Sequence, residues 1–370
     1  MAMNVLMVGV GAAGNKAVLE AISMGVIDVK DTCIINSTSK DFPEGYEGRK
    51  IILGKEDKGC GKERHLAKEF ARQAIGDKKL IFDDEVIYTY KTVIIATSVE
   101  GGTGSGSSPT IAKYFKQCYN RNVIVFAFTG FNDDVRGLSN TVEFFKEMSP
   151  EISVQTISNV AFLQQAGNNK LKAEEYANKE FATRVSVLTG QDFIDGSQNI
   201  DNTDILKLST TTGYMTTEKR YFDKSLETSD DYEKIIKKII YNSATIKSTD
   251  SCATRIGVIL NINENSKDAV DYTFASLKAT YGNPYELYTQ IQWDGKKEYI
   301  AFIVSGMKMP LDEIKAIYEK YKEESEKVNK KGDDFFTVID GFSSMEEDNQ
   351  FDMIRNTNKA MSLSDFLNNN

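Results

Sequence analysis

The sequence predicts an α/β protein with a mostly parallel sheet, a long central helix and a second, smaller α+β domain. Three observations lead to this class. Short apolar runs alternate with helix-period segments through the first half of the chain, which is typical of parallel strands joined by helices. Two glycine-rich stretches each stand between an apolar run and a helical pattern. From about residue 252 the pattern changes to strands interspersed with amphipathic helices.

Composition excludes several classes of protein. The chain has 370 residues, 41% hydrophobic and 27% charged, as in a globular protein of about two domains. A formal net charge of −9 argues against non-specific binding to nucleic acid or an anionic membrane. The four cysteines form no CxxC pair and there is one histidine, which disfavours a zinc site and a Ser-His-Asp triad. Scattered cysteines and the lack of a long apolar run fit a cytoplasmic location.

The first half is expected to form five strands and three helices. The predicted strands are the apolar runs at residues 5–10, 32–37, 92–98, 123–128 and 154–158. The predicted helices cover residues 12–25, 62–76 and 109–120. We expect Gly25 and Gly76 to end the first two helices. Pro109 should stand in the first turn of the third, where a missing N–H costs nothing.

The second half begins with a long helix and ends in a polar tail. Four apolar residues recur at spacings of three and four and predict a central helix with one buried face, namely Ala177, Phe181, Val185 and Leu188. Later strand patterns lie at residues 254–263, 286–294 and 298–307, around a helix at 266–282. The last two strands flank DGKK, which predicts a hairpin. A charged amphipathic helix is expected at 311–328.

The first glycine-rich stretch is GVGAAGN, residues 9–15. It follows a strand and opens a helix, which is the context that gives a GxGxxG pattern its meaning. Gly9 permits a tight turn, Gly11 lets a phosphate approach the backbone, and Gly14 allows close packing. The helix start then offers unpaired N–H groups and a partial positive charge. This stretch therefore predicts a phosphate-binding loop.

A dinucleotide-dependent dehydrogenase is the alternative interpretation of that loop. Such an enzyme needs an acidic residue near the end of the second strand to bind the ribose. That strand ends in INSTSKD, with Asn36 and Ser37 first and Asp41 late. The misplaced acid argues against an NAD-dependent oxidoreductase, which stays a distant alternative.

The second glycine-rich stretch is VEGGTGSGSSP, residues 99–109. It too follows a strand and precedes a helix, but no GK[ST] follows, so it is not a Walker A loop. A flexible linker would not stand between a buried strand and a helix. Two dense sets of N–H donors favour a ligand with several phosphates, bound from two sides.

These motifs resemble those of the tubulin/FtsZ superfamily. EGGTGSG (100–106) resembles its GGGTGTG loop, with Glu100 in place of the first glycine. GVGAAGN, INSTSKD and GCGK (59–62) resemble the first three phosphate loops in order. NIDNTDILK (199–207) followed by TGYM resembles the NxDxxD pattern after the family's central helix. The resemblance covers roughly residues 4–310, weakly after 250.

The resemblance implies a site for GTP or GDP, with Mg²⁺ on the phosphates and no confidently predicted protein ligand to the metal. The implied nucleotide contacts are Gly11, Ala12, Ala13, Asn15, Asn36, Lys40, Gly61, Gly101, Gly102, Thr103, Gly104, Ser105, Gly106, Asn132, Asp133, Arg136, Asn159 and Asn178. Two details stay open. Glu174 occupies the position of the family's stacking aromatic residue, so Tyr176 or another residue could stack on the base, and the ribose contact lies among residues 132–134.

The resemblance also implies that the next subunit completes the hydrolytic site. Asn199, Asp201 and Asp204 hold the NxDxxD positions, and the two acids, at i and i+3, can project from one helix face. Head-to-tail stacking would bring them to the neighbour's terminal phosphate, where they would position the attacking water. The alternative for both acids is helix capping, because carboxylates stabilise a first turn.

Five segments follow from the pattern and the resemblance. They are a GTP-binding Rossmann-like domain (1–172), a central helix (173–196), an activation loop with an α+β domain (197–310), a C-terminal helix (311–330) and an acidic, flexible tail (331–370). The implied function is a polymerising GTPase. Departures from FtsZ favour the TubZ branch, which segregates plasmid or phage DNA in the bacterial cytoplasm, and a DNA-binding adaptor on the C-terminal helix or tail. A cell-division or phage-spindle filament and a non-polymerising nucleotide-binding module are alternatives.

Overall fold

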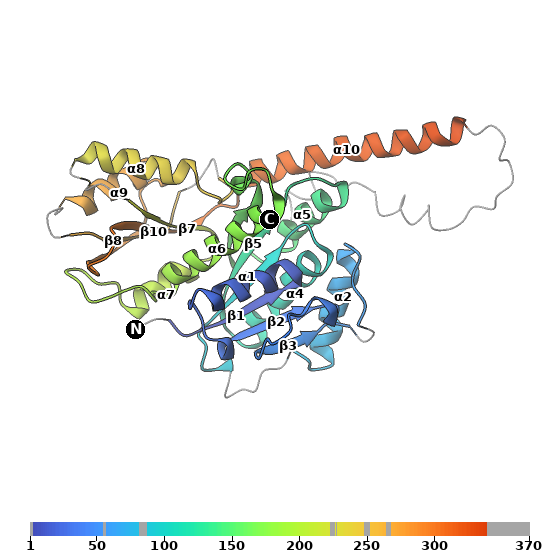
Figure 1. The fold of residues 1–370 in the computed structure, drawn as a ribbon, viewed down its shortest axis with the longest axis horizontal. Coiled ribbons are helices and arrows are strands. Elements are labelled where there is room, and N and C mark those ends of the chain that lie inside the picture. Colours follow the sequence, from blue (N-terminus) through green and yellow to red (C-terminus); the bar gives the residue numbers. More distant parts are fainter. Residues whose placement is uncertain are drawn as a thin grey trace.

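One ten-stranded sheet runs through the molecule in the order β3-β2-β1-β4-β5-β6-β7-β10-β8-β9 (Figure 1). The structure is a computed structural model, which describes residues 3–54, 57–80, 87–222, 226, 228–247, 252–263 and 268–338, with side chains to residue 328. The tail that the sequence predicts lies almost entirely outside these residues. The mostly parallel α/β class is confirmed.

Six parallel strands form the first part of the sheet. They are β1 (Val5–Val10), β2 (Thr32–Asn36), β3 (Arg49–Ile52), β4 (Thr92–Ser98), β5 (Asn122–Thr129) and β6 (Ser153–Ser158). Five of these match the predicted runs. Strand β3 is not among the predicted strands, because it is a short, half-exposed edge strand with only two isoleucines.

Helices cover both faces of these strands, as parallel connections require. On one face, α1 (Gly11–Ser23) and α6 (Lys170–Leu188) pack around Ala17, Phe181 and Val185. The other face carries α2 (Arg64–Gly76), α4 (Gly102–Cys118) and α5 (Val135–Glu147). The predicted buried stripe of the central helix is therefore confirmed.

The second half extends the same sheet with β7 (Gly213–Tyr221), β8 (Arg255–Asn261), β9 (Glu286–Gln292) and β10 (Tyr299–Met307). Two helices, α8 (Ser229–Tyr241) and α9 (Ala269–Tyr281), cover one face, and α7 (Asn202–Thr210) covers the other (Figure 1). The last helix, α10 (Leu311–Val338), packs on α5 and extends away from β7–β10. It runs past residue 330, where the sequence analysis ends it.

The predicted hairpin around DGKK is wrong. Strand β8 lies between β9 and β10, pairing parallel with the first and antiparallel with the second. The burial of the strands gives the reason. Nearly every residue of β10 is buried, so it needs a neighbour on each edge, whereas β9 is mostly half-exposed and suits an edge. Asn261 of β8 donates to Asp294 at 2.9 Å and thereby holds the crossing loop.

Two helix boundaries also differ from the prediction. The central helix α6 covers Lys170–Leu188, because the Asn169 side chain caps it early by accepting from the Lys172 N–H. Helix α4 begins at Gly102, seven residues before the expected start, so the glycine stretch forms its first turns and Pro109 lies inside it. A proline leaves the carbonyl four residues earlier without its N–H partner. Here Arg64 Nη2 donates to that carbonyl, Ser105 O, at 3.0 Å.

A buried ionic network fastens α6 to the sheet. Arg184, fully buried, donates to Glu180 at 2.9 Å and to Glu218 of β7 at 2.8 Å. Its Nη1 also donates to Thr245 Oγ1 at 2.7 Å. Burial raises the pKa of the Glu218 carboxyl, although the hydrogen bond from Ser243 acts in the opposite direction. Thr216 also donates to this carboxyl, at 3.3 Å. The central helix is therefore fixed to the strand that begins the second half of the sheet.

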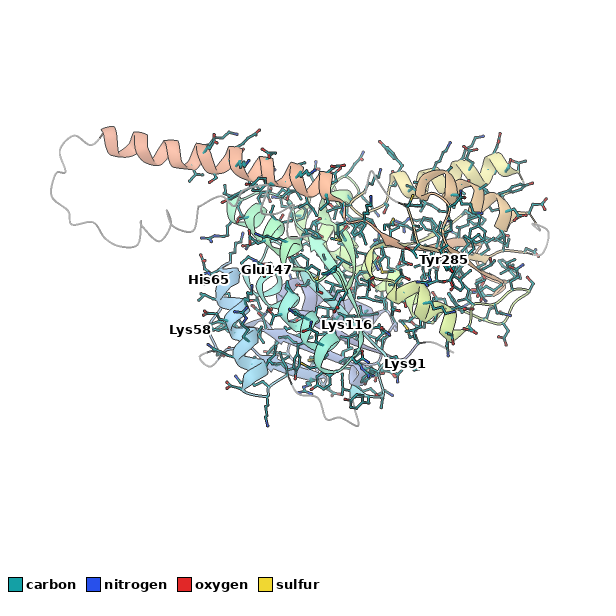
Figure 2. All side chains as sticks on the ribbon, turned by 180° about the vertical axis from the view of Figure 1, so that it is seen from behind. Lys58, His65, Lys91, Lys116, Glu147 and Tyr285 are labelled. Atoms are coloured by element: carbon teal, nitrogen blue, oxygen red, sulfur yellow. The ribbon has the colours of Figure 1, made fainter. Side chains whose placement is uncertain are left out.

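Replacing Arg64 by Met should lower the free energy of unfolding by about 2 kcal/mol. The guanidinium donates to Ser105 O and to Glu147 Oε2 at 3.1 Å, and the variant would leave both of these oxygens unpaired, although Lys68 would still hold Glu147 Oε1. Glu147 and His65, the next residue of α2, are labelled in Figure 2. Urea denaturation measures the effect. Lys68→Met is the control, because Lys68 also pairs with Glu147 but is more exposed, and it should cost less than about 1 kcal/mol. Equal losses would contradict this role of Arg64.

Candidate functional site

The loops that follow β1 to β6 gather at one edge of the sheet, because parallel strands all end there. The order β3-β2-β1-β4-β5-β6 reverses between β1 and β4, and such a reversal leaves a crevice for a ligand. The two glycine stretches follow these two strands. A Cβ placed on Gly11 would lie 3.0 Å from Gly104 N, so the two loops are in backbone contact.

Glycines also let α1 and α4 lie close to their neighbours in the fold. A Cβ on Gly14 would lie 2.0 Å from Ala96 O of β4, and one on Gly106 would lie 2.0 Å from Arg64 O. Neither α1 nor α4 has a side-chain cap on its first N–H groups. Two uncapped helix N-termini therefore converge, with unpaired donors and partial positive charge. This arrangement suits an anion with several oxygens, such as a polyphosphate. The predicted phosphate contacts that belong to these two loops and helix starts are Gly11, Ala12, Ala13, Gly101, Gly102, Thr103, Gly104, Ser105 and Gly106.

The second and third loops lie against the second glycine stretch. The hydroxyls of Ser37 and Thr103 are 2.8 Å apart. Asn36 donates to the Asp41 carboxylate at 2.9 Å, so this predicted contact has a protein partner, while Lys40 is exposed. A Cβ on Gly102 would lie 2.8 Å from Lys62 Cα, which places the loop of Gly61 and Lys62 beside the start of α4. Ser37 and Lys62 were missed as site residues, although both stand inside the quoted motifs.

Glu100, which breaks the glycine signature, orders the loop after β5. Its carboxylate accepts from the Asn132 N–H at 2.9 Å, and burial raises the pKa of this carboxyl. A Cβ on Gly130 would lie 1.9 Å from Glu100 Oε2, so a side chain there would displace this carboxylate. Asn132 takes the left-handed φ of 55°. The acid therefore positions the loop predicted to bind the ribose. The nearby Asp134 carboxylate also raises the pKa of Glu100, and Asp134 itself pairs with Lys62.

The charged residues of that loop have protein partners in this structure. Arg136 pairs with Glu63 at 2.9 Å. Asp133 pairs with Lys170. Asp134 caps α5 by accepting from the Gly137 N–H at 2.9 Å, which makes it the least suited of the three ribose candidates. The side chain of Asn132 keeps a buried Oδ1 without a partner among the described residues.

Two predicted asparagines carry buried polar atoms without partners. Both side-chain atoms of Asn15 and the Oδ1 of Asn159 lack a hydrogen bond within the described part of the chain. Buried amides are almost always paired, so an orphaned pair at one edge indicates groups that a ligand completes. Asn178 is half-buried, two turns into α6. Tyr176, two residues earlier, faces away from it on the helix and lines a different groove, with Phe162 and Arg220.

The predicted catalytic residues lie at the other end of α6. This helix has 19 residues and spans about 28 Å. Asp201 caps α7, accepting from the N–H groups of Thr203 and Asp204 at 2.7 and 2.8 Å. Asn199 accepts from the Gly196 N–H at 2.9 Å and so closes its own loop. Within the described residues the Asp204 carboxylate has no hydrogen bond or ion pair, and it alone of the three is uncommitted.

Comparison with known proteins finds a family match in the first part of the chain. Residues 4–167 match the Tubulin/FtsZ family, GTPase domain. The tubulin-like protein CetZ1 of Haloferax volcanii is 21% identical over 211 residues, 54% of this chain and 53% of that protein. The tubulin-like protein TubZ of Clostridium botulinum C phage is 28% identical over 217 residues, 53% of this chain and 57% of that protein. The chain thus spans about half the length of the curated relatives it matches.

Solved structures of tubulin-like proteins have a similar fold. A solved structure titled as a GTPγS-bound protofilament of CetZ2 from Haloferax volcanii superposes with a TM-score of 0.74 at 17% identity, covering 88% of this chain and all of the other. The likeness extends over both halves of the sheet. TubZ is thus among the best matches, together with CetZ proteins. In the described residues no helix could cross a bilayer. No cluster of three or more His, Cys, Asp or Glu side chains there could hold a metal ion.

Alanine at Gly101 and at Gly104 should separate binding from folding. A Cβ on Gly104 would lie 2.7 Å from Ser98 O and from Thr97 Oγ1, so Gly104→Ala should cost about 2 kcal/mol of stability. A Cβ on Gly101 meets nothing within 4 Å, so Gly101→Ala should fold normally. The added methyl would enter the space expected to hold phosphate and lower nucleotide affinity about tenfold. Urea denaturation and titration of a fluorescent GTP analogue measure the two effects. Normal affinity of Gly101→Ala would contradict this placement of the phosphates.

Proposed function

We propose that this chain binds and hydrolyses GTP and assembles head to tail into filaments, because residues 4–167 match the GTPase domain of the Tubulin/FtsZ family. One observation supports the proposal most directly. The uncapped N-termini of α1 and α4 meet at Gly11 and Gly104, and Asn15 of α1 and Asn159 after β6 carry buried side-chain atoms without a partner in the described residues. Phosphates would accept hydrogen bonds from the two helix N-termini, and a guanine base or ribose would pair with the asparagine side chains.

In this proposal each group has one task. The first-turn N–H groups of α1 and α4 bind phosphate oxygens, and the hydroxyl of Thr103 adds a donor. Lys62 now pairs with Asp134, and Arg136 pairs with Glu63. On releasing these carboxylates, the two cations would offset the negative charge of the phosphates. Asn159 and Asn178 contact the base. Mg²⁺, when bound with the nucleotide, would neutralise phosphate charge.

Hydrolysis in this scheme requires two subunits. The phosphate-binding edge and Asp204 lie at opposite ends of α6, so no subunit can bring its own Asp204 to its own phosphates. Stacking one subunit on the next would place Asp204 against the neighbour's terminal phosphate, where its carboxylate would orient the attacking water. A head-to-tail contact that does not close into a ring produces a filament. Because Asp201 and Asn199 hold the loop, we assign them positioning roles rather than contact with the water.

We further propose plasmid or phage DNA as the cargo, bound through an adaptor protein on the C-terminal helix or tail. The match to a phage TubZ supports this choice. A cell-division or phage-spindle filament uses the same chemistry and remains the alternative. An NAD-dependent oxidoreductase is disfavoured, because Asn36 donates to Asp41 and so occupies the carboxylate that a ribose would need.

Asp204→Ala should bind GTP and assemble but hydrolyse it at least about a hundredfold more slowly, leaving over-stable filaments. Phosphate release and electron microscopy with and without GTP measure this. Asp195→Ala is the matched control, because Asp195 is an exposed acid of the same loop, and it should turn over normally. Normal turnover by Asp204→Ala would exclude the assigned role. Light scattering that rises with NADH rather than GTP would favour the oxidoreductase.

The cargo has a separate test. If the filament segregates DNA, the plasmid or phage that encodes it should be lost from dividing cells when Asp204→Ala replaces the wild-type chain. Labelled filaments should lie along that DNA. Filaments gathered at the division site, with the DNA retained normally, would favour a division role.

A further inference from the structure

Two buried glutamines of β9 hold the loop that precedes Asp204. This α6–α7 loop, residues 189–201, crosses the edge of the sheet before α7 begins. Gln290 and Gln292 are 1% and 3% exposed, although glutamine is ordinarily a surface residue. They stand two positions apart in a strand, so both side chains lie on the same face. Tyr285, next to the start of β9, is labelled in Figure 2 far from His65 of α2.

Both polar atoms of each amide form hydrogen bonds with the backbone of the loop. Gln290 Oε1 accepts from the Ile200 N–H at 2.7 Å, and its Nε2 donates to Ile194 O at 2.8 Å. Gln292 Oε1 accepts from the Ile194 N–H at 3.1 Å, and its Nε2 donates to Asp192 O at 2.9 Å. Each amide therefore replaces the hydrogen bonds that a neighbouring strand would supply.

The backbone of the loop adds a short pairing to the same strand. Ser197 N–H donates to Ile291 O at 3.0 Å, and Ile291 N–H donates to Gln198 O at 3.0 Å. A Cβ on Gly196 would lie 1.8 Å from Ile291 O, so glycine is needed for this approach. Backbone pairing alone would tolerate a shift of the loop along β9. The side-chain amides fix the register, because a shift would leave buried polar atoms unpaired.

The register of the loop on β9 sets the position of Asp204. Ile200, held by Gln290, directly precedes Asp201, whose carboxylate caps α7 and receives the Asp204 N–H at 2.8 Å. Loop, cap and first turn of α7 therefore form one continuous chain of hydrogen bonds from β9 to Asp204. At the start of the loop, Lys219 pairs with the Asp192 carboxylate at 2.6 Å, which fixes the other end.

From this geometry we propose that Gln290 and Gln292 are positioning residues for GTP hydrolysis, setting where Asp204 meets the neighbouring subunit. The inference rests on the proposed function, because it assumes that Asp204 acts on a neighbour's nucleotide. Misplacing a catalytic group by about 1 Å can cost about a hundredfold in rate. Loss of the two amides should therefore reduce hydrolysis without touching nucleotide binding, which takes place at the other end of α6.

The test is Gln290→Met, which keeps the length of the side chain and removes its hydrogen bonds. GTP turnover in assembled filaments should fall about tenfold or more, while GTP affinity stays within about twofold of wild type. The matched control is Gln155→Met. Gln155 is fully buried in β6, but its amide has no partner in the described chain, so this variant should turn over normally. Equal turnover by Gln290→Met and wild type would overturn the proposal.

A double variant distinguishes positioning from general destabilisation. If Gln290 acts through Asp204, Gln290→Met should cause no further loss of turnover in an Asp204→Ala background. A loss of similar size in both backgrounds would overturn the proposal. Hydrogen exchange gives a second readout, since the Ile200 amide, which donates to Gln290 Oε1, should exchange faster in Gln290→Met while amides of β5 keep their protection.

These results separate the two claims. Slow turnover by Asp204→Ala with normal turnover by Gln290→Met would remove the glutamine proposal and leave the proposed function intact. Normal turnover by Asp204→Ala would remove the proposed function itself, whatever Gln290→Met does.

Discussion

The close approach of α1 and α4 at the centre of the sheet is the constraint on which the rest of the site depends. Gly14 lets α1 lie on the backbone of β4, and Gly11 lets its start touch Gly104. A side chain at any of these positions would separate the two helix N-termini and disperse their N–H donors. The loops after β2, β3 and β5 then pack around this contact, through Ser37, Lys62 and Glu100.

The second constraint is the fixed distance between the two ends of α6. The buried pairing of Arg184 with Glu218 attaches this helix to β7, and breaking such a pair is costly because it leaves an uncompensated charge. The edge where the loops after β1 to β6 gather and the α6–α7 loop are therefore held apart within one subunit. In the proposed function this separation makes hydrolysis depend on assembly, because neither end would complete the reaction alone.

Long-range pairing accounts for the errors made from the sequence. DGKK has the chemistry of a tight turn, but turn chemistry cannot show that β8 will insert between the two strands that flank it. Pro109 has the chemistry of a helix start, but Arg64, 45 positions away in sequence, satisfies the carbonyl that an internal proline frees. In both cases a distant residue overrode a local preference.

The sequence by itself determined the class of fold, the two glycine-rich loops and the order of the motifs, since periodicity and glycine spacing are local properties of the chain. Tertiary structure alone decided how those residues are used. It showed that Asp201 caps a helix while Asp204 is uncommitted, that Glu100 orders a loop, and that Gln290 and Gln292 hold the α6–α7 loop. These roles depend on hydrogen-bond partners up to 100 residues away, which no local pattern can reveal.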